Sequence, residues 1–509
     1  MKKIWCLLLA AAMVTGAAQA SHAVDFKAKG VWLASFQYGQ NGNFTNGGHT
    51  GYDPSEDEFE ARSRVRLVID AVADENLSGQ VYFEIGKSIW GKAEDPQGGM
   101  AMGADKNIVK LKRAFIDWRV PDTDLKLRMG IQGIGLPYMA MGGPTVFQSD
   151  VAAITASYVF NENAAMTAFW ARPYNDNYVG NADGDQQNFM DNMDMAGLMV
   201  PLTFDGFKLT PWGMFASIGS NTFRKNDNYV GNKINGVNGG YALSGLFPLR
   251  ADLLSHKEKL NAYGTAWWGG LSGEITKWDW DPFRIAWDFS YGNVSYDDGS
   301  LNRSGWLAGL LLEYNLDWTK LGLFGWYSSG DDDNVGNGSE RLPTISNDYG
   351  PCSFSGTFMG PDINGLERDR VIGNNLVGTW GVGFRLKDMS FLEDLKHTFH
   401  ISLLGGTNDP GILKKYHERT GEWMAPNNPE GTTKVGRENL YLTTRDYALE
   451  FGLLNEYKIY DNLQVNLEAS YIALWLDKSD DVWGQSLTGG DHRDIRDAWN
   501  VSVLFIYSF

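Results

Sequence analysis

The chain has 509 residues and a formal net charge of -18 at pH 7, with 60 glycine, 19 tryptophan and 22 tyrosine residues. This acidic balance argues against binding to nucleic acid, which requires a basic face. With two cysteines in the whole sequence, a disulfide framework is not expected, and no linker or composition break divides the chain into several domains.

The first 23 residues have the order of a secretory signal peptide, with a basic pair, an apolar stretch and then small residues. Cleavage after Ala23 is favoured, because a strand begins at once, and cleavage after Ala20 is the alternative. Either cleavage removes Cys6 and leaves Cys352 as the single cysteine of the mature chain. The remaining residues, 24–509, are expected to form one domain.

Apolar and polar side chains alternate along most of this domain, as in strands that have two different faces. In the first strand, Phe26 and Trp32 share one face, and Lys27 and Lys29 share the other. The pattern predicts about 18 strands, with 16 as the alternative if one weak pair belongs to a loop. The predicted strands are 24–38, 59–70, 79–90, 108–120, 124–134, 151–160, 164–173, 192–203, 206–219, 259–275, 282–294, 303–317, 319–329, 372–388, 397–406, 446–459, 463–476 and 496–509.

The segment 496–509 shows the alternation most clearly, since every odd position from Trp499 to Phe509 is apolar. Soluble proteins usually shorten or cover such an apolar edge strand. A membrane barrel instead closes the edge onto its first strand and exposes the apolar face to lipid. We therefore expect 24–38 to pair antiparallel with 496–509.

The predicted connections alternate between short and long. Short turns include 121–123, 161–163 and 460–462, whereas long polar loops are expected near 39–57, 91–107, 135–150, 174–191, 220–258, 330–371, 407–445 and 477–495. Short periplasmic turns and long extracellular loops are typical of outer-membrane barrels. No stretch after the signal reaches the roughly 18 apolar residues of a membrane helix. The fold class predicted is an all-β transmembrane antiparallel barrel, wide enough to leave an aqueous lumen.

Four stretches carry a resemblance to a known family, namely VDFKAKGVWLASF at 24–36, EARSRVRLVID at 60–70, RAFIDWRVPDTDLKLRMGIQ at 113–132 and the terminal VLFIYSF. The mature chain resembles Gram-negative outer-membrane homotrimeric porins, most closely those of sulfate-reducing bacteria. The resemblance implies a trimer in the outer-membrane lipid that passes small hydrophilic solutes and ions by passive diffusion, without cofactor or chemistry. A substrate-specific channel for sugars or for anions such as sulfate is the alternative.

In general porins the third long loop folds into the lumen and narrows it, and the resemblance places this constriction at 135–150, GLPYMAMGGPTVFQSD. The enterobacterial loop contains an acidic Pro-Glu-Phe-Gly-Gly stretch, whereas here Asp150 is the only charged residue. The position of the constriction is therefore expected to be shared, but its charge pattern is not.

The run Arg62, Arg64 and Arg66 puts three guanidinium groups on the polar face of one strand, because their spacing is two. The same face of the neighbouring strands carries Lys27, Lys29, Arg113, Arg119, Lys126 and Arg128. We interpret these side chains as a basic lumen wall that sets ion preference. The alternative interpretation is a neutral wall, in which carboxylates pair with the cations: Glu58, Glu60, Asp70, Glu84 and Asp117.

The sequence has three further features, which give weaker indications of function. The repeat NDNYVGN at 175–181 and 226–232 and the cluster 331–334 offer oxygens for Ca²⁺ in external loops, although solvated turns explain them as well. Aromatics predicted to share the lumen face could form a slide for sugars, but such residues more often lie at the rim belts or at a subunit interface. They are Tyr82, Trp170, Trp212, Trp267 and Trp326. The scattered histidines match no spacing known from a barrel hydrolase, so enzymatic activity, with a hydrolase as the remote alternative, is not expected.

Overall fold

The computed structural model describes residues 24–42, 44, 57–93, 100–103, 107–175, 192–219, 244–249, 263–277, 282–345, 376–426, 440–488 and 495–509. The predicted signal peptide with Cys6, the lone Cys352, the second NDNYVGN copy and most of the first copy lie outside these residues. No helix in the described part of the chain is both long enough and apolar enough to cross a membrane.

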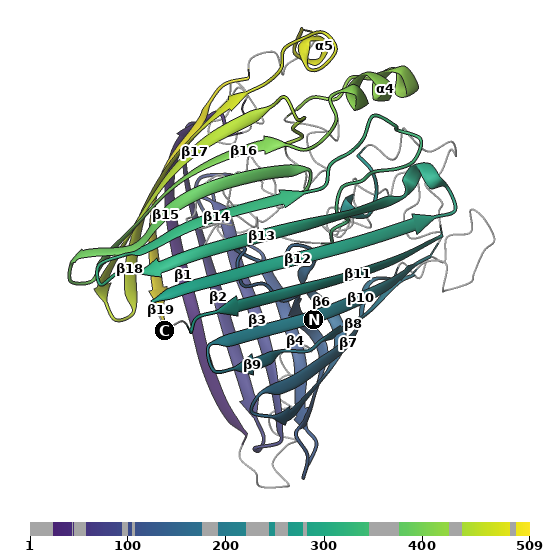
Figure 1. Ribbon diagram of the computed structural model, residues 1–509. Helices are drawn as coiled ribbons and strands as arrows, with labels where there is room; N and C mark the ends of the chain where they lie inside the picture. The colour runs from purple at the N-terminus through teal and green to yellow at the C-terminus, as the bar shows by residue number, and fades with distance from the viewer. Residues whose placement is uncertain are drawn as a thin grey trace.

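The described residues form one antiparallel sheet that closes on itself as a barrel (Figure 1). The first half of the sheet contains β1 (Asp25–Gln40), β2 (Phe59–Val72), β3 (Leu77–Ile89), β4 (Val109–Arg119), β5 (Leu125–Gly135), β6 (Gln148–Asn161), β7 (Ala164–Asn175), β8 (Asn192–Met199), β9 (Leu202–Phe204) and β10 (Phe207–Ile218). The second half contains β11 (Gly264–Ile275), β12 (Phe283–Tyr296), β13 (Arg303–Asn315), β14 (Lys320–Ser328), β15 (Thr379–Leu392), β16 (Leu395–Gly406), β17 (Tyr447–Tyr460), β18 (Leu463–Trp475) and β19 (Ala498–Ser508).

The nineteen segments make eighteen barrel strands, because β8 and β9 are two pieces of one strand. Both pieces pair with β7 on one side and β10 on the other. Val200 and Pro201 separate them, and proline has no N–H to donate to a ladder. The prediction of eighteen strands, with 192–203 as a single strand, is confirmed.

The barrel closes where β1 meets β19. Ten residues of each strand pair antiparallel, from Val31 opposite Ser508 to Gln40 opposite Trp499. Gly30 and Phe509 continue the ladder with two hydrogen bonds: Gly30 N–H donates to Phe509 O at 2.9 Å, and Phe509 N–H donates to Gly30 O at 3.1 Å. The predicted closure is confirmed, and with it no edge of the sheet is left unpaired.

Side chains alternate across the barrel wall as the sequence predicts. On β1, Phe26, Trp32 and Tyr38 are exposed on the outer face, whereas Ser35 and Gln37 on the inner face are buried. Apolar side chains on the outer face and polar side chains on the inner face match the environment of a membrane barrel. The boundaries of β15 differ most from the predicted 372–388: the strand begins at Thr379, and two register shifts beyond Leu386 extend its pairing with β16 to Leu392.

The connections also alternate as predicted, with short turns at one end of the barrel and long segments at the other. Two short helices, α4 (Gly411–Thr420) and α5 (Gly484–Thr488), lie together at the long-loop end (Figure 1). Tyr416 of α4 and Leu487 of α5 belong to one apolar cluster around the buried Trp483. The long loops described here thus have a small core of their own.

Candidate functional site

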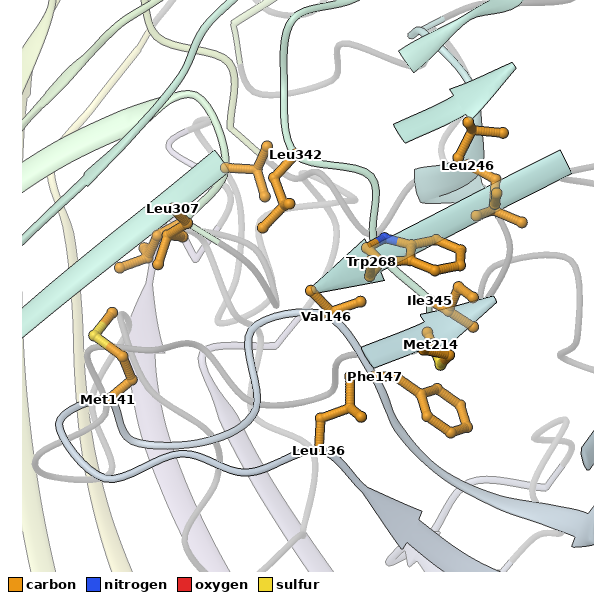
Figure 2. Close-up of a cluster of buried hydrophobic side chains, with 14 of the residues drawn as sticks. Leu136, Met141, Val146, Phe147, Met214, Leu246, Trp268, Leu307, Leu342 and Ile345 are labelled. Carbon is orange, nitrogen blue, oxygen red and sulfur yellow. The ribbon is translucent and has the colours of Figure 1, made fainter. Parts of the chain in front are cut away.

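One long connection folds inside the barrel. Residues 136–147, called the inner loop below, join β5 to β6 and bury Leu136, Val146 and Phe147 almost completely. Figure 2 shows these side chains opposite Trp268 of β11 and Ile345, a residue of the long segment after β14. The connection near 135–150 therefore enters the lumen, as the resemblance implies.

Apolar side chains fill the part of the lumen between the inner loop and strands β10 to β14. Trp268 is 2 % exposed, its indole N–H donates to Pro343 O at 2.9 Å, and Ile345 N–H donates to Val146 O at 2.7 Å. Leu307 of β13, which also lies inside, is 1 % exposed. This side of the barrel interior is packed like a protein core and leaves little room for water.

The inner wall of β2 to β5 is different, because its charged side chains remain partly open. The side chains of Arg113, Lys126 and Arg128 are 39 %, 45 % and 32 % exposed. A groove of about 290 Å³ begins at β5 of this wall and extends onto β6 and β7. Its polar lining consists of Lys126, Arg128, Gln132, Thr155, Ser157 and Thr167. Within the described part of the barrel, this groove reaches the basic wall at Lys126 and Arg128.

On β2 and β3, two of the predicted arginines share one carboxylate. Arg66 Nε donates to Glu84 Oε2 at 2.9 Å, and Arg64 Nη1 lies 4.0 Å from the same oxygen. The side chain of Arg64 is only 2 % exposed, whereas that of Arg66 is 32 % exposed. Arg66 is thus the residue of this trio that solutes can reach.

Asp150 is placed differently from the prediction. It was expected in the constriction loop, but β6 begins at Gln148, and Asp150 stands in this strand opposite Gly133. Arg113 Nε donates to Asp150 Oδ1 at 2.6 Å, and Lys112 Nζ lies 3.4 Å from the other carboxylate oxygen. Asp150 therefore partly neutralises the basic wall and does not oppose it from the loop, which has no charged side chain of its own.

Arg64, Arg66 and Glu84 form one trio, and Lys112, Arg113 and Asp150 form a second. A third trio lies nearer the short-turn end of the barrel. Asp117 of β4 accepts from Arg128 Nε at 2.6 Å and Nη2 at 2.8 Å, and Lys126 Nζ lies 2.9 Å from it. The Arg128 guanidinium also stacks over the Phe115 ring at 4.0 Å, a favourable cation–π contact. Each of the three trios contains two cations and one carboxylate, so each keeps a formal charge of about +1 when all its groups are ionised.

The remaining predicted cations have simpler surroundings. Arg62 pairs with Glu60, Lys29 Nζ lies 3.4 Å from Asp70, and Lys27 Nζ lies 3.6 Å from the exposed Asp25. Arg119 is exposed at the end of β4 and forms no ion pair with another described residue.

In the alternative interpretation of a neutral wall, Glu58 pairs with one of the cations, but the structure gives it other partners. It accepts from the Tyr38 hydroxyl at 2.5 Å and from Gln40. Glu58 precedes Phe59, the first residue of β2, so the alternation of the strand does not yet fix its direction.

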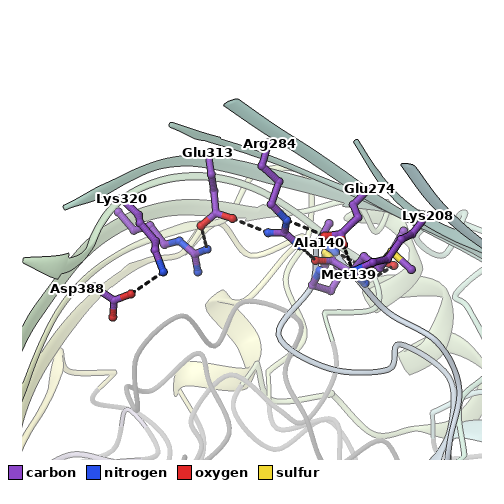
Figure 3. Close-up of polar contacts among 11 residues, drawn as sticks. Met139, Ala140, Lys208, Glu274, Arg284, Glu313, Lys320 and Asp388 are labelled. Atoms are coloured by element: carbon purple, nitrogen blue, oxygen red, sulfur yellow. Dashed lines mark hydrogen bonds and ion pairs between the residues drawn. The ribbon is translucent and has the colours of Figure 1, made fainter. Parts of the chain in front are cut away.

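A chain of ion pairs crosses the opposite wall (Figure 3). Lys208 of β10 and Arg284 of β12 both bond to Glu274 of β11, at 2.7 and 2.8 Å. Arg284 also pairs with Glu313 of β13, which accepts from Arg385 of β15 at 2.5 Å. The Glu313 and Arg385 side chains are each 7 % exposed, so this chain ties strands together more than it meets solutes.

Two of the aromatics predicted to face the lumen point outward. Trp170 and Trp267 are 42 % and 49 % exposed, while their neighbours Phe169 and Trp268 are buried inside the barrel. Where two neighbouring residues of a strand are both aromatic, the sequence does not indicate which of them faces outward. For this reason Trp170 and Trp267 were assigned to the wrong face. Of the inward residues, Trp212 and Trp326 are buried. A slide of these aromatics for sugars is therefore wrong, and Tyr82 alone lies beside the basic wall, between Arg66 and Arg113.

The cluster 331–334 uses its oxygens for the fold. Asp331 accepts from Ser339 at 2.5 Å and from Tyr441 at 2.8 Å, and Asp332 accepts from the Asn334 amide at 2.7 Å. Among the described residues, no group of three histidine, cysteine or acidic side chains is arranged to hold a metal ion.

Two residues near the constriction were not singled out in the sequence. Asp288 of β12 is 3 % exposed and accepts hydrogen bonds from the inner loop, and Tyr138 is the large exposed side chain of that loop. Within the predicted strand 282–294, Asp288 has the same parity as Arg284 and Ser290, and this alternation puts it on the polar, inward face, as observed. Its partner was not predicted, because a strand pattern carries no information about which loop reaches it.

Comparison with solved structures identifies proteins of the same fold. No family model matches the chain, and no curated protein matches it. Among solved structures, the outer membrane protein opdK from Pseudomonas aeruginosa matches with a TM-score of 0.51 and 9 % identity, over 95 % of this chain and 98 % of that one. OccAB3 from Acinetobacter baumannii matches with a TM-score of 0.51 and 10 % identity, over 95 % and 99 %. OccAB4 from the same organism gives 0.50 and 9 %, over 96 % and 99 %. The chain therefore shares its fold, along almost its whole length, with an outer-membrane β-barrel.

Proposed function

We propose that the protein is a porin of the Gram-negative outer membrane, through which small hydrophilic solutes and ions diffuse passively. The observation that carries the proposal is the closed barrel with an apolar outer face and a partly exposed, charged inner wall along β2 to β5. Export through the signal peptide at 1–23 belongs to the same proposal.

Liposome swelling with sugars of graded size tests this function. We expect swelling rates that fall smoothly as the sugar becomes larger, because the passage acts as a sieve. Saturation by one sugar or anion would favour the substrate-specific alternative. Vesicles that contain the folded protein and do not swell would contradict a channel and reopen the hydrolase alternative.

Along the basic wall, we propose that the passage favours anions. Arg62, Arg64, Arg66, Arg113, Arg119, Lys126 and Arg128 are the cations assigned to it, with Asp150 as a partial counter-charge. The support is the two-to-one ratio of cations to carboxylates in each trio. Such a ring or wall of charge sets ion preference at close range.

We also propose a homotrimer, on the basis of the resemblance to trimeric porins. The outward residues Ala28 and Ala34 of β1 are small enough for a neighbouring subunit to approach closely. Gly30 does not add to this argument, since a Cβ there would lie 2.5 Å from Phe509 Cζ of the same chain. Native mass spectrometry of detergent-extracted protein is expected to give three chains, and a purely monomeric species would contradict the proposal.

A further inference from the structure

One carboxylate of the barrel wall, that of Asp288, binds the turn of the inner loop. Asp288 accepts backbone N–H groups from three consecutive residues: Met139 at 2.9 and 3.1 Å, Ala140 at 2.8 Å and Met141 at 2.8 Å. The residue is 3 % exposed. Hydrogen bonds to a charged acceptor in such a secluded place are among the stronger ones in proteins.

Neighbouring side chains of the same wall add to this contact. Arg284 Nη2 donates to Met139 O at 3.0 Å, and Ser272 Oγ donates to Pro137 O at 3.0 Å. Figure 3 shows Met139 and Ala140 beside the ion-pair chain that contains Arg284. Polar groups of the wall thus hold the turn of the loop at its amides and its carbonyls.

We propose that Asp288 is the positioning residue that keeps the passage open, by holding the inner loop against strands β11 to β13. The wall blocks movement of the turn at Met139 to Met141 in one direction, so a turn released from Asp288 moves into the lumen. This role of Asp288 rests on the proposed channel function, because the position of the inner loop sets the cross-section of the passage.

The change Asp288→Asn tests the proposal in planar bilayers. An amide oxygen accepts fewer of these N–H groups, and the amide NH₂ faces donors it cannot bond. We expect frequent closures, with the ratio of closed to open time raised roughly tenfold, the effect of losing about 1.4 kcal/mol of hydrogen bonding. Asp388→Asn is the matched control: it also removes one negative charge from the wall, but Asp388 pairs with Lys320 and not with the inner loop. It should gate as the unmodified protein does.

A cross-link separates loop release from a mere loss of charge. A Cβ on Gly309 would lie 3.0 Å from Met141 Cγ, the atom that the sulfur of a cysteine at 141 would replace, so cysteines at these two positions can form a disulfide. In a Cys352→Ser background, Asp288→Asn with Met141→Cys and Gly309→Cys should gate often when reduced and stay open when oxidised. Unchanged gating in Asp288→Asn, or closures that persist after oxidation, would overturn the proposal. A wild-type protein without conductance would instead refute the channel function itself.

Discussion

Replacing Arg66, Arg113 and Arg128 together with glutamine is expected to shift the reversal potential toward cation preference. Each change leaves its carboxylate with one cation, so the three trios become neutral. A unit charge roughly 8 Å away in water contributes about 0.5 kcal/mol, and the Debye length at physiological ionic strength is also about 8 Å. We therefore expect the anion-to-cation permeability ratio to fall severalfold at low salt and less at high salt.

The opposite substitutions provide the matched control for this prediction. Glu84→Gln, Asp117→Asn and Asp150→Asn remove the shared carboxylates and should raise anion preference, with the same dependence on salt. The arginine triple variant should keep the barrel intact, because its new side chains are polar and the buried Arg64 is retained. If neither triple variant changes the reversal potential at low salt, the basic wall does not govern selectivity.

Deleting Phe509 is expected to reduce assembly far more than it changes the conductance of the barrels that do assemble. The deletion removes the two hydrogen bonds to Gly30, each contributing about 1 kcal/mol, together with the ring that lies over that glycine. A loss of about 2 kcal/mol lowers the folded fraction of a marginal intermediate roughly thirtyfold.

The fraction that resists protease and shifts on gels after heating measures this assembly. Phe509→Ala keeps the backbone bonds and should assemble to an intermediate degree. Gly30→Val places branched carbons where the Phe509 ring and Arg66 O now lie, at 2.5 and 2.6 Å from a Cβ, and should resemble the deletion. Normal assembly of both the deletion and Gly30→Val would contradict the role given to this closure.

The sequence predicted most of the barrel because a strand between lipid and water has two chemically different faces. The alternation in β12 assigned Phe289 outward and Asp288 inward correctly. Prediction failed where the two faces of a strand do not differ in chemistry. In Phe169-Trp170 and Trp267-Trp268, aromatic side chains point to both faces. Prediction also misplaced the start of β6, whose faces are both small or apolar and show no clear alternation.

The constriction could be located but not resolved from the sequence. The resemblance placed the inner loop, and spacing placed the arginines on one wall. The bonds from the loop to Asp288 join residues 147 to 149 positions apart in the sequence, and Val146 packs against segments that are also distant in the sequence. Local patterns give no information over such distances. Glu84 and Asp117 were foreseen as partners only in the alternative interpretation of a neutral wall, and Asp150 was expected in the loop. The two-to-one ratio follows from the register of the neighbouring strands.

The reversal potential of the unmodified protein in a planar bilayer, under a salt gradient at low ionic strength, tests the central claim most directly. A water-filled passage along the basic wall predicts stable conductance steps and a reversal potential displaced toward that of the anion, with the displacement shrinking as salt is raised. Stable steps with cation preference would contradict the basic wall as the path of ions, and a folded, inserted protein without conductance would contradict the channel.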